Sequence, residues 1–261
     1  FDNTAWAAFA QATFDMTDRL HLTLGGRYTD EDKAFTPDQI IYQNYYAGFS
    51  SLVPADNPLA ALDAPFLQAG GRILPLLEKD IDISEFTPMA NLSYDLSDDI
   101  MVYLSYSEGF KSGGFTQRVF PPIVPPFTAP PGTADIDLIP TYDPEFVEVL
   151  ELGFKGTFAD GRIRLNGALF STDYEDLQVQ VFNSVAPVTQ NIGKASIEGI
   201  ELELLASPGR GWLVESSVAL IDASYDEIDT SNTLIGRNND FERVPEVTAS
   251  LGLSREMSLG D

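Results

Sequence analysis

The residues best suited to hold a ligand are aromatic and basic, and they lie in two stretches of the sequence. Aromatic faces bury a large area against a flat, partly apolar ligand. The first stretch supplies four such side chains, Tyr42, Tyr45, Tyr46 and Phe49. We interpret them as ligand-binding candidates, with packing of the segment on itself as the equal alternative.

The second stretch is residues 109–115, GFKSGGF, in which Phe110, Lys111 and Phe115 are separated by small residues. Lys111 is a candidate contact for an anionic ligand, because the glycines allow a close approach. Glycines in a strand more often mark a bend. The structural interpretation, in which Phe110 and Phe115 pack nearby, is therefore favoured over binding.

Acidic residues also gather in clusters, and carboxylate oxygens are the ligands that calcium prefers. The clusters are Asp80, Asp82 and Glu85; Asp135 and Asp137; and Asp222, Asp226, Glu227 and Asp229. None has the spacing of an EF-hand loop, so solvated acidic loops are expected instead. His21 is the only histidine, and a single imidazole makes neither a zinc site nor a catalytic triad. We predict no metal site, no resident cofactor and no enzyme.

Composition narrows the class of protein further. The chain has 261 residues, no cysteine and a formal charge of −25. The absence of cysteine excludes disulfides, and the negative charge excludes a general nucleic-acid binder, which needs a basic face. No apolar run is long enough for a membrane-spanning helix. A transmembrane strand remains open, because it needs only about 10 alternating residues.

Alternation of apolar and polar residues predicts about nine strands. Residues 101–115 show it best: Val102, Leu104 and Tyr106 fall on one face, and Tyr103, Ser105 and Ser107 on the other. The remaining strands are expected near residues 4–14, 20–29, 81–95, 146–155, 163–181, 199–204, 212–220 and 247–253. Short turns follow every other strand, and longer connections, two of them very long, follow the rest.

This pattern predicts an all-β, antiparallel, up-and-down transmembrane barrel segment with short periplasmic turns and long extracellular loops. It is favoured over a soluble sandwich because the inward faces are polar. The inward charged residues, which we expect to form salt bridges across the lumen or to a plug, are Glu151, Lys155, Glu201, Glu203 and Glu215. Trp6, Phe14, Tyr94, Phe154 and Trp212 lie near strand ends, where an aromatic girdle belongs.

Several segments, in this order, resemble the barrel of TonB-dependent outer-membrane receptors of the siderophore-receptor type. They are TAWAAFAQ (4–11), LGGRYTDEDK (24–33), YDLSDD (94–99), GFKSGGF (109–115), DPE (143–145), ELGFK (151–155), DYEDLQ (173–178) and GIELE (199–203). The resemblance covers nearly every strand. It implies a barrel of about 22 strands closed by an N-terminal plug.

The resemblance also implies the function: import of a ferric siderophore across the outer membrane of a Gram-negative bacterium, with energy from the TonB–ExbB–ExbD complex. Residues 1–261 are expected to be a partial barrel domain that lacks the plug, the TonB box and the first and last strands. Its other expected contacts are outer-membrane lipid and lipopolysaccharide. The alternatives are a passive porin, a secreted all-β binding module, or a receptor for a glycan, vitamin B12 or haem.

Overall fold

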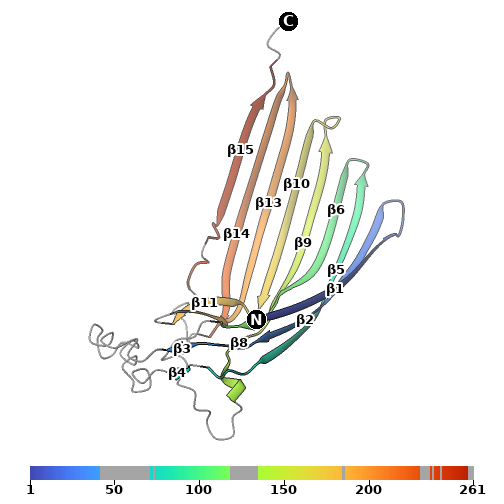
Figure 1. Cartoon of the computed structure of the whole chain (residues 1–261). Helices are drawn as coiled ribbons and strands as arrows, with labels where there is room; N and C mark the ends of the chain where they lie inside the picture. The colour runs from blue at the N-terminus through green and yellow to red at the C-terminus, as the bar shows by residue number, and fades with distance from the viewer. Residues whose placement is uncertain are drawn as a thin grey trace, which may run out of the picture.

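The structure is a computed structural model, and it describes residues 1–41, 71–72, 74–117, 135–183, 186–229, 236, 238–241 and 243–257. Nine antiparallel strands form one sheet in the order β1-β2-β5-β6-β9-β10-β13-β14-β15 (Figure 1). These strands are β1 (Asp2–Asp15), β2 (Leu20–Phe35), β5 (Lys79–Ser97), β6 (Ile100–Lys111), β9 (Glu145–Phe158), β10 (Ile163–Glu175), β13 (Gly193–Gly209), β14 (Trp212–Ile228) and β15 (Val247–Arg255). The prediction of an antiparallel, up-and-down sheet is confirmed.

The two ends of the sheet differ in how the strands are joined. Short turns join β1 to β2, β5 to β6, β9 to β10 and β13 to β14, all at the upper end of Figure 1. We call this the turn end. The longer connections lie at the opposite, loop end. At the β9–β10 turn, Ala159, Asp160 and Gly161 all have positive φ (55°, 55° and 83°), and Asp-Gly is a sequence that tight hairpin turns of positive φ favour.

One strand prediction was wrong. Residues 163–181 are not continuous: β10 ends at Glu175, and Asp176 adopts a positive φ of 52°. The chain reverses there and forms a separate hairpin from β11 (Gln178–Asn183) and β12 (Ala186–Asn191). A non-glycine residue in the left-handed region breaks a strand, and nothing in the alternation of side chains indicates it.

The nine strands align their large aliphatic residues into continuous rows. Cross-strand pairing joins Phe14, Leu22, Leu92, Leu104, Leu152, Leu169, Ile200, Leu220 and Val247 into one row. Because alternate residues point to opposite sides, this row defines an apolar face and the intervening residues a polar face. Leu104, Leu152 and Leu202 are 45%, 53% and 45% exposed. No second sheet covers the apolar face within the described residues, contrary to a sandwich.

The buried core lies at the loop end, beyond the main sheet. Leu74 and Ile139 are fully buried, and Val181, Val188 and Ile192 form a small cluster around the β11–β12 hairpin. Two short strand pairs, β3 (Ile40–Ile41) with β4 (Gly71–Arg72) and β7 (Gly114–Phe115) with β8 (Thr141–Tyr142), and a 3₁₀ helix at Asp135–Leu138 lie in the same region. Among the described residues, no helix has both the length and the apolar character to cross a membrane.

β1 and β15 are the outermost strands of the main sheet, so the described strands do not close into a barrel. Every residue of β1 is exposed. An unpaired edge presents free backbone N–H and C=O groups, and such groups are not left facing lipid. Both edges are therefore suited to further strand pairing.

Candidate functional site at the loop end

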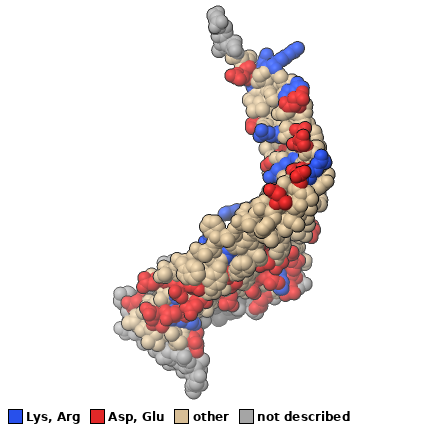
Figure 2. Space-filling view, turned by 90° about the vertical axis from the view of Figure 1, so that its right-hand side faces the viewer, with Lys and Arg blue, Asp and Glu red and all other residues tan. Residues whose placement is uncertain are grey.

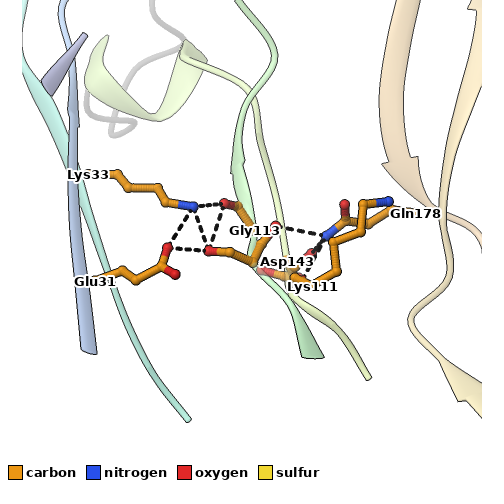
Figure 3. A network of polar contacts seen from close by, with 7 residues as sticks. Glu31, Lys33, Lys111, Gly113, Asp143 and Gln178 are labelled. Atoms are coloured by element: carbon orange, nitrogen blue, oxygen red, sulfur yellow. Dashed lines mark hydrogen bonds and ion pairs between the residues drawn. The ribbon is translucent and has the colours of Figure 1, made fainter. Parts of the chain in front are cut away.

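A polar network joins β2 to the segment that follows β6, across the intervening strand β5 (Figure 3). Lys33 on β2 donates hydrogen bonds to Ser112 Oγ and to the Gly113 carbonyl (2.7 Å), and its Nζ lies 3.0 Å from Glu31 Oε2. Ser112 Oγ also donates to Glu31 Oε2 at 2.7 Å. These contacts fix the position of the glycine-rich segment against the polar face of β2.

The ion pair in this network is largely out of solvent. The side chains of Lys33 and Glu31 are 10% and 16% exposed. Burial alone would raise the pKa of Glu31, but the hydrogen bond from Ser112 and the charge of Lys33 outweigh burial, so the pKa lies below its usual value. Glu31 is therefore ionised, and it neutralises Lys33 within the chain.

Gln178 and Asn191 stand at the two ends of the β11–β12 hairpin. Gln178 attaches the hairpin to the glycine-rich segment after β6, and both residues attach it to Asp143. Gln178 Nε2 donates to the carbonyls of Lys111 (3.3 Å), Ser112 (3.1 Å) and Asp143 (2.9 Å). The backbone N–H of Gln178 donates to Glu145 Oε2 at 2.6 Å. Asn191 both donates to the Asp143 carbonyl and accepts from its N–H. Two side-chain amides thus hold three chain segments together.

Aromatic packing completes this end of the sheet. Phe115 is 5% exposed, and its ring lies 5.4 Å from that of Phe35 and 6.3 Å from that of Phe1. Gly114 allows this arrangement, since a Cβ there would lie 2.7 Å from the Tyr142 hydroxyl oxygen. The three rings pack on one another beside the Lys33 network.

The polar face continues toward the turn end as a series of side-chain pairs. The Tyr103 hydroxyl donates to Glu151 Oε1 at 2.5 Å, and Lys155 Nζ lies 5.6 Å from the Tyr103 ring centre. Asn166 donates to Glu203 at 3.4 Å. At the turn end His21 lies between two carboxylates, with Nδ1 2.6 Å from Asp15 and Nε2 3.3 Å from Asp95.

On the apolar face near the loop end, aromatic and acidic residues take the place of the aliphatic residues that form the rows. Trp6 Nε1 donates to Asp30 at 3.0 Å, and the rings of Trp6 and Tyr28 lie 5.4 Å apart. Asp32 faces Asp82 directly across the strands. Partial desolvation and the facing Asp82 carboxylate raise the pKa of Asp32. Figure 2 shows acidic side chains gathered at the loop end, whereas most of the visible lysine and arginine lies toward the turn end.

The structure places the predicted binding residues as follows. Tyr42, Tyr45, Tyr46 and Phe49 lie outside the described residues. Phe115 is buried in the aromatic cluster, Phe110 is half-buried opposite Phe146, and Lys111 is exposed with its Nζ 3.8 Å from Glu145. The five charged residues Glu151, Lys155, Glu201, Glu203 and Glu215 share the polar face, because each alternates with a residue of the apolar rows.

The residues that organise the loop end were not predicted from sequence. Glu31, Ser112, Gln178 and Asn191 appear in the alternation pattern only as polar positions. Each of them has at least one partner between 33 and 81 residues away along the chain. The only sequence signal for these contacts is an acidic or amide residue next to a turn, as at Asp143 and Gln178. The arrangement positions chain segments against one another. Among the described residues no group of three or more acidic or histidine side chains could hold a metal ion.

A family model described as TonB dependent receptor-like, beta-barrel, matches residues 1–260. A ferric-pyoverdine 358 receptor of Pseudomonas putida is 27% identical over 212 residues, which are 79% of this chain and 20% of that protein. A ferric-pyoverdine BN7/BN8 receptor of the same organism is 23% identical over 240 residues, 91% of this chain and 23% of that one. The chain therefore spans about a fifth of the length of these relatives.

Solved structures share the fold. The ferric yersiniabactin uptake receptor FyuA of Yersinia pestis superposes with a TM-score of 0.65 and 21% identity, covering 97% of this chain and 31% of that one. The copper transporter OprC gives a TM-score of 0.61 and 16% identity, covering 98% and 32%. Barrels of this kind lie in the outer membrane with apolar rows facing lipid, as the rows of this sheet require. The chain belongs to the family of TonB-dependent receptor β-barrels.

Proposed function

We propose that these residues form part of the wall and extracellular loops of an outer-membrane receptor that imports ferric siderophores with energy from TonB. The observation that carries this proposal is the row of apolar residues from Phe14 to Val247, with a polar face behind it. Such a sheet is stable only between lipid and an enclosed polar interior. The ferric-siderophore ligands named for the two curated relatives support the choice of cargo.

In this proposal the loop end binds ligand and the strands supply the membrane-fitted wall. In the sequence, Tyr42, Tyr45, Tyr46 and Phe49 fall between β3 and β4, which form a short strand pair of their own. A ferric chelate needs aromatic area more than a catalytic group, and no resident cofactor is required. The plug and the TonB box, which would couple binding to the TonB–ExbB–ExbD complex, belong to other parts of the intact receptor.

The test is growth of a strain lacking the intact gene under iron limitation, with ferric chelates supplied one at a time. We expect the deletion to abolish growth on at least one ferric siderophore and the restored gene to recover it. Uptake of the same iron-labelled chelate should stop when a protonophore collapses the proton gradient. Normal growth of the deletion strain on every chelate would contradict the siderophore assignment.

The protonophore also separates the alternative functions. A passive porin would take up the chelate regardless of the proton gradient. A receptor for a glycan, vitamin B12 or haem would keep the energy dependence but lose growth only on that compound. Copper uptake is a further arm of the same assay, because the copper transporter OprC shares the fold.

A further inference from the structure

The apolar face is interrupted by a groove across β6, β9, β10 and β13. Its volume is about 350 Å³, and its side walls are formed by Val102, Leu152, Phe154, Leu169, Ile200 and Leu202. Hardly any polar atom is exposed inside it. The groove lies between two neighbouring rows of the ladder: Leu152, Leu169 and Ile200 in one row, and Val102, Phe154 and Leu202 in the next.

Gly167 lines the floor of this groove. Gly167 on β10 pairs with Phe154 on one side and with Leu202 on the other, so the second row has no side chain at this position. The Phe154 ring and the Leu202 side chain lean over the bare backbone. A Cβ on Gly167 would lie 2.5 Å from a Phe154 ring carbon and 2.8 Å from a Leu202 methyl carbon. Any larger residue would therefore fill the depression or push its walls apart.

The chemistry of the walls restricts the occupant. A polypeptide segment would bring backbone N–H and C=O groups that find no partner in the groove, and each such group is costly in hydrocarbon. An alkyl chain has no such groups. The groove is also continuous with the exposed apolar rows: its wall residues Leu152, Leu169 and Ile200 are 53%, 49% and 43% exposed. The surrounding solvent is therefore the hydrocarbon of the membrane.

We propose that the groove at Gly167 is a binding site for one acyl chain of an outer-membrane lipid. A chain lying in the groove touches apolar atoms below it and on both sides, whereas a chain on a flat part of the row touches them below only. Dispersion attraction grows with the number of such contacts. The chain in the groove is accordingly held longer than its neighbours. This inference concerns the outer wall and is independent of the transported ligand.

The test compares lipid retention by the intact receptor after extraction in mild detergent, measured by native mass spectrometry. Wild-type receptor should retain one lipid that resists further washing. Gly167→Leu should reduce the retained fraction about tenfold, because it fills the groove. Ala249→Leu is the matched control: Ala249 is exposed on β15 in the same row, away from the groove, and the added leucine should leave retention unchanged.

Gly167→Leu must displace Phe154 and Leu202, and this displacement can impair assembly. A second variant, Leu169→Ala combined with Ile200→Ala, lowers one wall without adding bulk and should also reduce retention. Equal retention in wild type and both groove variants would overturn the proposal, and so would a wild type that retains no lipid. Loss of a receptor dimer in Gly167→Leu would also overturn it, by identifying the occupant as a second copy of the receptor.

Discussion

Lys33 is a nearly buried lysine at the loop end. Its ammonium group contacts the Glu31 carboxylate, the Ser112 hydroxyl and the Gly113 carbonyl. Lys33→Met would leave the Glu31 carboxylate without its countercharge and the Gly113 carbonyl without its donor. Breaking such a pair costs about 1–3 kcal/mol. We expect amide exchange of residues 112–117 in the intact receptor to accelerate about tenfold or more, as measured by hydrogen–deuterium exchange mass spectrometry.

Lys194→Met provides the matched control. Lys194 pairs with Glu175, but the two side chains are 47% and 56% exposed, and exposed pairs contribute about 0–1 kcal/mol. This variant should leave exchange at residues 112–117 unchanged. An identical effect from both variants would show that the exchange reports general loosening rather than the buried pair.

His21 gives the turn end a dependence on pH. Both ring nitrogens face carboxylates, of Asp15 and Asp95, and both can donate only when the ring is an imidazolium. The hydrogen bond to Asp15, which outweighs the partial desolvation, raises the pKa of His21, and Asp95 adds to the increase. Because the folded pKa is raised, this stabilisation is complete below the unfolded value and is lost as pH rises through the folded one.

We therefore expect the thermal unfolding midpoint of the detergent-solubilised receptor to fall more steeply in wild type than in His21→Ala as the pH rises above about 6.5. The difference between the two proteins should be largest at acid pH and should shrink as the imidazolium deprotonates. A constant difference as the pH rises would mean that His21 contributes only through packing.

At the scale of the strand, each residue's effect depends on the face it occupies. Leu104 and Ser105 are neighbours on β6, with Leu104 in the apolar row and Ser105 on the polar face. Leu104→Arg should destabilise the receptor by about 2–4 kcal/mol, since a charge near the bilayer midplane has this cost. Ser105→Arg should cost less than about 1 kcal/mol. Urea unfolding from lipid vesicles measures both, and equal costs would contradict the assignment of faces.

The alternation that separates Leu104 from Ser105 is also why the strands were predictable. Side-chain direction in a strand depends only on the parity of the position, so residues near Val102 and Leu202 identify strands without any knowledge of their partners. The β11–β12 hairpin was missed because a single backbone angle at Asp176 decides it. Alternation continues through that residue as if the strand did not end.

The polar network of the loop end could not be predicted for a different reason. Lys33 meets Ser112, 79 residues further along the chain, because the chain after β6 lies against the polar face of β2. That placement depends on the pairing of several strands. The GFKSGGF segment was singled out in sequence by its glycines and aromatic residues. Its contacts to Glu31 and Gln178 depend on positions in space that no local pattern contains.

At the scale of the whole molecule, the apolar rows and the distribution of charged residues both distinguish the turn end of the sheet from the loop end. The row from Phe14 begins beside the β1–β2 turn and reaches Val247 at the loop end of β15. Measured from the turns, it shifts from the end of β1 to Leu220, which lies midway along β14, as strand tilt in a barrel requires. Carboxylates crowd the loop end, and three of the described lysines there pair with one: Lys33 with Glu31, Lys111 with Glu145 and Lys194 with Glu175.

This charge distribution predicts how ions reach the extracellular mouth. The acidic loop end repels anions over a distance that salt controls, since the Debye length shrinks from about 30 Å at 0.01 M to about 8 Å at 0.15 M ionic strength. A ferric tris-catecholate carries three negative charges, whereas a ferric trihydroxamate is neutral. We expect association of the tris-catecholate with the intact receptor to accelerate about tenfold across this range, and that of the trihydroxamate to stay constant.

Stopped-flow quenching of tryptophan fluorescence measures both rates. Asp32→Asn combined with Asp82→Asn should flatten the first dependence, and a tris-catecholate rate that falls with salt would mean that the field at the mouth is positive.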